Sequence, residues 1–168
     1  KYEKLVADVN GRYYDDEYPI IRRKVMALEG VLEDIGRDRY TCHNDTVPEN
    51  FIKGADRNYL IDWEYAGMAD PLLDIAMGAI YSYMDFEEAK QFLKDYLQVA
   101  KAEGKEKPLI LSRRTEADLE KLLIAYMGLS GLLWSLWCAY KMRKGQEFGE
   151  YSLKMLRYFK DAKKILGI

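Results

Sequence analysis

C-H-N-D-T-V-P-E-N at residues 42–50, followed by L-I-D-W-E at residues 60–64, is the part of the sequence that decides the fold. Asp45 and Asn50 fall on a polar loop, and Asp62 ends a short apolar run. Such oxygen-bearing side chains are the ligands that Mg²⁺ prefers. Phosphoryl transfer needs positioning and charge neutralisation more than covalent help. The H-x-D-x(4)-N…D pattern is therefore typical of a phosphotransferase site.

The alternative interpretation of these residues is a polar loop with scattered acids. A bare H-x-D has little specificity, but D-x(4)-N followed by a second Asp after an apolar strand is far more specific. His43 is the only histidine, so histidine metal sites and Ser-His-Asp schemes lack partners. We expect a structural role for His43, with its ring bonded to the loop backbone near Asp45.

Apolar periodicity predicts a mainly α-helical fold with a small β-hairpin. Phe51-Ile52 can pair with residues 59–61 across a polar turn at 54–58. Asp70 and Pro71 mark the N-cap and first residue of a helix. The predicted helices cover residues 18–35, 71–80, 86–102, 115–142 and 150–166.

The 168 residues carry a formal net charge of −2, from 26 basic and 28 acidic residues, and 49% of them are hydrophobic. This composition excludes disorder and a disulfide scaffold, and suits one compact domain. The charge balance offers no general attraction to nucleic acid, so we expect no such partner. Cys42 and Cys138 lie in unrelated contexts, so we expect buried, reduced thiols and a cytoplasmic protein.

Residues 122–140 contain no charged side chain, and this uncharged stretch is long enough for a membrane-spanning helix. The run includes Gly128, Ser130 and Gly131, and its aromatic residues lie inside it as well as at its ends. These features favour a buried core helix, and we expect no membrane partner.

Two longer stretches make the resemblance to a family specific. C-H-N-D-T-V-P-E-N-F…Y-L-I-D-W-E-Y-A-G-M-A-D-P-L-L-D-I-A, with the tail L-L-W-S-L-W-C-A-Y…E-F-G-E-Y-S-L-K-M-L-R-Y-F, resembles the choline kinase family. This family includes the bacterial LicA-type enzymes and lies within the aminoglycoside-phosphotransferase-like kinases. The resemblance implies ATP and Mg²⁺ as cofactors and choline as the acceptor. It implies that Asp45 is the catalytic base, that Asn50 and Asp62 bind Mg²⁺, and that Asp74 braces the catalytic loop. Glu64 is either a second acid supporting the metal site or a solvated side chain.

The resemblance also implies a domain organisation. Residues 1–168 are expected to form the C-terminal lobe of a protein-kinase-like fold, with a catalytic loop at 42–53, a metal-binding segment at 59–65 and a helical acceptor-binding region at 71–168. The 12 glycines form no G-x-G-x-x-G, and no strand lysine precedes the catalytic loop. We therefore expect that the nucleotide-clamping N-terminal lobe is missing from this chain, and that the chain alone turns over poorly.

Aromatic residues near the C-terminus suggest where the acceptor binds. Trp134 and Trp137 share one face of a helix, where they either pack in the core or attract a desolvated quaternary ammonium by about 0.5–2 kcal/mol. By the resemblance, further acceptor contacts come from the helix after the metal motif and from the final helix, which offer Tyr81, Tyr83 and Tyr151. Tyr81 departs from the family pattern, because choline kinases carry an acidic group there.

Other functions remain open at this point. Thiamine, ethanolamine or an aminoglycoside could replace choline as the acceptor without changing the chemistry. A non-catalytic module that binds quaternary ammonium compounds is the alternative from another class. It would bind its ligand without Mg²⁺ and would leave Asp45, Asn50 and Asp62 unexplained.

Overall fold

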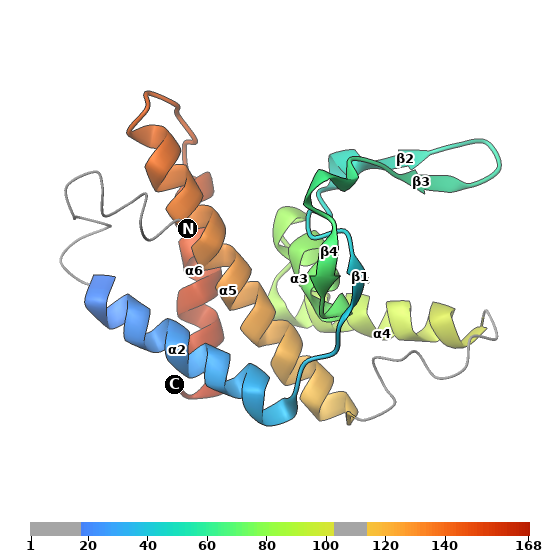
Figure 1. The fold of residues 1–168 in the computed structure, drawn as a ribbon, viewed down its shortest axis with the longest axis horizontal. Helices are drawn as coiled ribbons and strands as arrows, with labels where there is room; N and C mark the ends of the chain where they lie inside the picture. The colour runs from blue at the N-terminus through green and yellow to red at the C-terminus, as the bar shows by residue number, and fades with distance from the viewer. Residues whose placement is uncertain (1–17, 103–113) are drawn as a thin grey trace.

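The computed structural model describes residues 18–102 and 114–168, and its main feature is a set of helices arranged around one long central helix (Figure 1). The fold is mainly helical with small antiparallel sheets, as predicted. The helices are α2 (Tyr18–Ile35), α3 (Pro71–Tyr81), α4 (Phe86–Ala102), α5 (Glu116–Met142) and α6 (Tyr151–Leu166). The strands are β1 (Tyr40–Cys42), β2 (Phe51–Lys53), β3 (Asn58–Leu60) and β4 (Gly67–Ala69).

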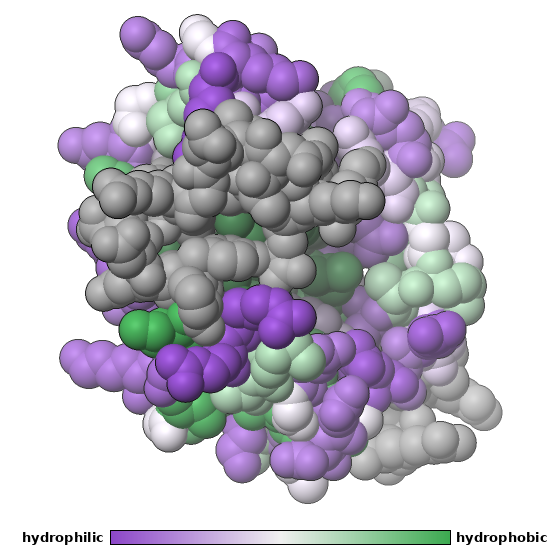
Figure 2. Space-filling model, turned by 60° about the vertical axis from the view of Figure 1, so that its left-hand side comes forward, coloured by the Kyte–Doolittle hydropathy of each residue, from purple (hydrophilic) through white to green (hydrophobic). Residues whose placement is uncertain are grey.

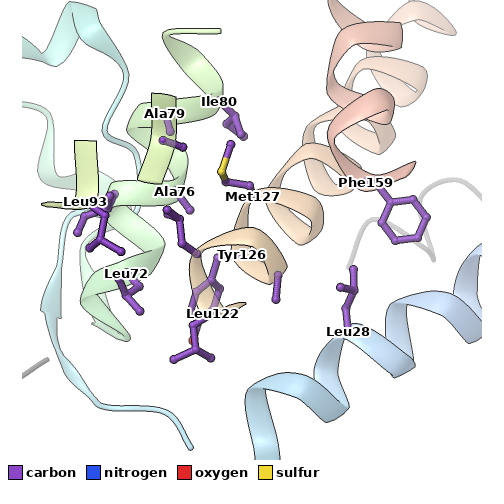
Figure 3. Packing of buried hydrophobic residues seen from close by; sticks show 14 of the residues in the cluster. Leu28, Leu72, Ala76, Ala79, Ile80, Leu93, Leu122, Tyr126, Met127 and Phe159 are labelled. Carbon is purple, nitrogen blue, oxygen red and sulfur yellow. The ribbon is translucent and has the colours of Figure 1, made fainter. Parts of the chain in front are cut away.

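Helix α5 is central because it is apolar around most of its circumference. On one side Leu122 and Met127 contribute to a cluster with side chains of α3 and α4, and on the other side Leu28 of α2 and Phe159 of α6 face each other (Figure 3). All four side chains are fully buried or nearly so. A helix that is hydrophobic all round is expected in the middle of a domain.

By length and composition alone α5 could cross a membrane, but 72% of its most apolar window is buried inside the domain. It is therefore the core helix that the sequence predicts. On the face shown in Figure 2, hydrophilic side chains are interspersed with apolar ones. Cys42 and Cys138 are buried free thiols, and burial raises the pKa of each to about 11.

Two glycines allow α6 to pack closely on α5. A Cβ atom at Gly128 would lie 2.7 Å from Cβ of Ala162, and one at Gly131 would lie 2.5 Å from the backbone oxygen of Met155. Real side chains do not tolerate such distances, and the Met155 backbone has little freedom to move. The small residues therefore determine how close α6 lies to the central helix.

The predicted helix boundaries agree with the structure at most ends. Asp70 caps α3 by accepting a hydrogen bond from the Leu72 backbone nitrogen, and Thr115 and Asp118 form a capping box before α5. Gly36 ends α2 with a φ of 86°, as a C-cap glycine does. Gly104, a residue typical of helix ends that follows the predicted helix at 86–102, lies outside the described residues.

The hairpin is confirmed, but the sequence-based prediction of a single hairpin was incomplete. β2 pairs with β3 in antiparallel register, with Phe51 opposite Leu60, and Asn58 belongs to β3 rather than to the turn. A second two-stranded sheet pairs β1 with β4, with Cys42 opposite Gly67. Each strand of this sheet has three residues, too few to show a periodic pattern. This sheet brings the start of the loop predicted to be catalytic next to the start of α3.

A buried ion pair at the start of α5 was also missed. Arg114 donates a hydrogen bond to Asp70 at 2.9 Å and another to the backbone oxygen of Gly36 at 2.8 Å. The Arg114 and Asp70 side chains are 4% and 1% exposed. The Asp38 backbone nitrogen donates to the same Asp70 carboxylate. These bonds join the end of α2, the start of α3 and the start of α5.

The close approach of α5 and α6 predicts opposite effects for two Gly→Ala substitutions in helices. Gly131→Ala places a methyl group against the α6 backbone and should lower the free energy of unfolding by about 2–3 kcal/mol. Gly30→Ala in α2 meets no atom within 4 Å, so it should raise the free energy of unfolding by about 0.5–1 kcal/mol through the helix preference of alanine. Urea denaturation followed by circular dichroism measures both. Equal effects of the two variants would contradict the packing argument.

Candidate active site

The loop that carries Asp45 is tied to α3 by one carboxylate. Asp74 accepts the backbone N–H of His43 at 2.8 Å on one oxygen and that of Asn44 at 2.7 Å on the other. The Thr46 hydroxyl adds a bond of 2.6 Å to the backbone oxygen of Asp74. Asn44 has a φ of 63°, a left-handed conformation that this bonding stabilises. The loop conformation around Asp45 therefore depends on α3.

His43 connects this loop to the segment that precedes Asp62. The ring is 1% exposed, and its Nε2 donates a hydrogen bond of 2.8 Å to the backbone oxygen of Ile61. The Trp63 ring packs edge-to-face with the His43 ring, with the centroids 4.9 Å apart. The bonded backbone is thus next to Asp62 and not next to Asp45, which differs from the prediction. The two segments lie side by side in the fold although 18 residues separate His43 and Ile61.

Asn50 lies between the same two segments. Its side-chain nitrogen donates a hydrogen bond of 2.9 Å to the backbone oxygen of Asp45, and its backbone oxygen accepts the N–H of Ile61 at 3.0 Å. The amide nitrogen is therefore committed to the loop, and Oδ1 is the atom left for a ligand. Asp62 is exposed and has a φ of 64° and a ψ of 62°. Such a left-handed aspartate is strained, and strain of this kind clusters at functional sites.

The donor atoms of Asn50 and Asp62 fit a magnesium ion better than a transition metal. Within the described ranges, no three His, Cys, Asp or Glu side chains lie close enough together to hold a metal ion. Mg²⁺ is commonly bound by one or two carboxylates together with substrate phosphates, and it keeps several of its waters. Asn50 Oδ1 and the Asp62 carboxylate could supply the protein share of such a site.

A cavity of about 650 Å³ opens beside Asp45, within the range of small-molecule sites. It contains Asp45 together with all five aromatic residues predicted to bind the acceptor. Its lining residues are Asn44, Asp45, Val47, Pro48, Glu49, Glu64, Tyr65, Met77, Tyr81, Tyr83, Leu133, Trp134, Trp137, Phe148 and Tyr151. Asn50 and Asp62 are not among them, although Glu49, next to Asn50, and Glu64, two residues after Asp62, are.

One side of the cavity is an aromatic wall, formed by Tyr81, Trp134, Trp137 and Phe148. The ring centroids of Tyr81 and Trp134 are 5.5 Å apart, those of Trp134 and Trp137 are 5.4 Å apart, and those of Trp137 and Phe148 are 5.2 Å apart. The rings come from α3, from α5 and from the segment before α6. Tilted and edge-to-face pairs at these distances stabilise each other, so the wall is preorganised.

Tyr83 and Tyr151 form a separate pair at the cavity, with their rings edge-to-face and 6.5 Å apart. Tyr83 has a φ of 56° and follows the end of α3, which is how it comes to face α6. Burial raises the pKa of the Tyr151 hydroxyl. Burial and the neighbouring Asp45 carboxylate raise the pKa of Tyr81 still more. Both phenols are therefore neutral at physiological pH.

The electrostatics of the cavity favour a cation. Asp45, Glu49 and Glu64 are acidic, and the described lining includes no Lys, Arg or His. Glu64 is exposed and lines this cavity. The ammonium of Lys141 lies 5.2 Å from the Trp137 ring centroid without lining the cavity. Aromatic faces and carboxylates together attract an organic cation.

Sequence reasoning missed several lining residues, above all Phe148. It lies in the E-F-G element, which was noted only for its resemblance, and its contact with Trp137 brings together residues from either side of a turn. Leu133 was also overlooked, although it directly precedes Trp134 on α5. Glu49 was a usable signal, because an acid adjacent to Asn50 in the catalytic loop is expected near the site.

The architecture is that of the helical lobe of a protein-kinase-like fold, and comparison with known proteins places it more narrowly. The model of the choline/ethanolamine kinase family matches residues 13–164. The chain therefore belongs to the choline/ethanolamine kinase family.

Among curated proteins, the chain is 35% identical over 135 residues to Protein LicA of Haemophilus influenzae, covering 79% of this chain and 38% of that protein. Among solved structures, it matches the choline kinase LicA of Streptococcus pneumoniae with a TM-score of 0.70 and 35% identity, over 99% of this chain and 52% of that one. A structure of LicA in complex with AMP matches with a TM-score of 0.71 and 34% identity, over 99% and 51% of the two chains. The chain thus spans about half the length of these two solved relatives and 38% of the length of the curated relative.

The two hydrogen bonds that Asp74 accepts from the loop predict that replacing this aspartate by asparagine destabilises the loop, whereas the same replacement elsewhere does not. Asp74→Asn leaves one acceptor for two N–H groups, so it should cost about 2–3 kcal/mol of unfolding free energy and expose the His43 and Asn44 amides to hydrogen exchange. Asp85→Asn is the matched control, because Asp85 accepts the backbone nitrogens of Glu87 and Glu88 on one oxygen that asparagine keeps. Unchanged exchange of the loop amides in Asp74→Asn would contradict the brace.

Proposed function

We propose that this chain is the C-terminal catalytic and acceptor-binding lobe of a choline kinase, which transfers the γ-phosphate of ATP to the hydroxyl of choline. The observation that carries the proposal is the cavity in which the Asp45 carboxylate faces an aromatic wall. This arrangement suits a molecule with a hydroxyl at one end and an apolar cation at the other. The LicA relatives support it, since the solved relative from Streptococcus pneumoniae is described as a choline kinase.

In this proposal Asp45 orients the acceptor hydroxyl and takes its proton. The transition state of phosphoryl transfer is loose, so the main contribution of the base is to aim the oxygen at the phosphorus. The hydrogen bonds of Asp74 to the loop support this role, because they fix the backbone that carries Asp45.

Asn50 and Asp62 are the proposed ligands of Mg²⁺, whose chemistry is to neutralise the charge that develops on the phosphates. The oxygen donors support this assignment, and so does the bond from Ile61 to Asn50, which keeps the two segments together. His43 supports the same segment through its bond to the backbone oxygen of Ile61. Glu64 lines the acceptor cavity, so we assign it to attraction of the cation.

ATP binding requires more than the described residues. A protein-kinase-like enzyme clamps the phosphates with a Gly-rich loop and a strand lysine, neither of which occurs in this sequence. Since the chain spans about half of its solved relatives, we propose that an N-terminal lobe of the whole protein supplies them. The relative solved with AMP supports nucleotide binding in the family.

The choice of choline over other acceptors rests on the wall of rings. A trimethylammonium group cannot donate hydrogen bonds, so it gains most from ring faces and least from polar acceptors. A primary ammonium or a polyamine sugar gains more from carboxylates and carbonyls. The edge-to-face rings of Trp134, Trp137 and Phe148 therefore favour the quaternary cation.

A panel of acceptors tests this function. The full-length protein should release ADP with ATP, Mg²⁺ and choline, and less with ethanolamine, thiamine or an aminoglycoside. Asp45→Asn should lower kcat by about 100-fold or more, the usual contribution of a general base, with the KM for MgATP nearly unchanged. Asp95→Asn on the exposed side of α4 is the control and should retain activity. An Asp45→Asn enzyme with wild-type kcat would refute the assignment.

Trp137→Ala tests the proposed cation site. Loss of one ring face should raise the KM for choline by roughly 3- to 30-fold, the equivalent of one cation–π contact, with a smaller change in kcat. Trp137→Phe keeps a ring face at this position and should retain most of the affinity. Steady-state kinetics with choline as the varied substrate measures both variants. An unchanged KM in Trp137→Ala would exclude this ring from cation binding.

A further inference from the structure

One hydrogen bond connects the aromatic wall to the proposed base. The Tyr81 hydroxyl donates to Oδ1 of Asp45, with the two oxygens 3.1 Å apart, although 36 residues separate them in the chain. Asp45 lies on the loop and Tyr81 is the last residue of α3. The hydroxyl is the part of Tyr81 that leaves the wall, because its ring packs against Trp134. Tyr81 therefore contacts both halves of the cavity.

We propose that Tyr81 is a positioning residue for Asp45, which holds one carboxylate oxygen so that the other faces the acceptor hydroxyl. The inference rests on the proposed function, and it assigns Tyr81 a role beyond supplying a ring to the cavity. Among the described residues, Oδ1 of Asp45 accepts this bond and Oδ2 accepts none. A carboxylate held by one oxygen has lost most of its freedom to rotate, and its second oxygen keeps a defined direction.

Tyr81 is suited to be a permanent donor. Burial and the nearby Asp45 carboxylate raise the pKa of its hydroxyl well above the usual tyrosine range, so it keeps its proton at physiological pH. It cannot compete with Asp45 for the acceptor proton, and its only role toward the carboxylate is to donate. The backbone of the base is held separately, through the Asn50 side chain and the Asp74 carboxylate.

The bond from Tyr81 acts on the rate through the orientation of the Asp45 carboxylate. In a loose phosphoryl-transfer transition state little proton transfer has taken place, and basicity contributes little to the rate. Orientation contributes much more, since a misplacement of about 1 Å can cost roughly 100-fold in rate. Loss of the hydroxyl should therefore slow the reaction.

The arrangement links acceptor binding to the orientation of the base. An acceptor cation that packs on the wall contacts the ring of Tyr81, whose hydroxyl in turn holds Asp45. The Tyr81 side chain therefore connects the aromatic wall, which would bind the cation, directly to the Asp45 carboxylate, which would face the hydroxyl.

Tyr81→Phe in the full-length protein tests the inference, because it removes the hydroxyl and keeps the ring. We expect kcat with choline to fall by about 10- to 100-fold, the equivalent of one hydrogen bond to a charged group. The KM values for choline and for MgATP should stay within about twofold, because the ring and the nucleotide contacts remain.

Tyr158→Phe is the matched control. It also removes a hydrogen-bonded phenol hydroxyl, which donates to the backbone oxygen of Met84 at 2.8 Å, and Tyr158 does not line the acceptor cavity. Both variants should lose a similar amount of thermal stability, but Tyr158→Phe should keep the wild-type kcat. The difference separates positioning of the base from a general structural effect.

Three results would overturn the inference. If Tyr81→Phe has the same kcat as the wild type, the hydroxyl does not hold the base. The proposed function would still stand in that case, because the wild type would be active on choline. A raised KM for choline with an unchanged kcat would place the hydroxyl on the cation instead. An equal loss of kcat in Tyr158→Phe would mean that stability is responsible. A wild type inactive on every acceptor would instead refute the proposed function itself.

Discussion

The Asp74 carboxylate, bonded to the amides of His43 and Asn44, is the constraint on which the rest of the candidate site depends. Two charge-assisted bonds hold a left-handed residue, Asn44, directly before Asp45. The carboxylate itself is placed by the cap of α3, where Asp70 and Pro71 start the helix at a defined residue. A change in the residue at which α3 begins would therefore displace the loop that carries Asp45.

Helix α5 provides the support for both the core and the site. Its first half packs against α3, α4 and α2 through fully buried leucines, and its second half presents Trp134 and Trp137 to the cavity. Because α3 packs on the same helix, Tyr81 and the two tryptophans meet without any contribution from a loop. Sites built on packed helices hold their geometry more closely than sites built on loops. The relative positions of these three rings follow from this packing, and Phe148 from the segment before α6 completes the wall.

Much of the fold and of the candidate site could be predicted from the sequence, because the signals are local. Helix α2 follows from apolar spacing, and the start of α3 follows from Asp70 and Pro71. Asp45, Asn50 and Asp62 were recognisable since their residue types and spacing match one chemistry. Weak or absent local signals explain what was missed. β1 and β4 are too short for periodicity, and Arg114 has no feature in the sequence that marks its bond to Asp70.

The sequence by itself determined which residues are candidates for the chemistry and which helices form, because residue type, spacing and capping act over a few positions. Only the tertiary structure decided that His43 bonds to Ile61, that Phe148 completes the aromatic wall, and that Tyr81 reaches Asp45. These contacts join segments far apart in the chain or separated by a turn. Their geometry depends on how close the helices approach, which small residues such as Gly131 set and which no local pattern records.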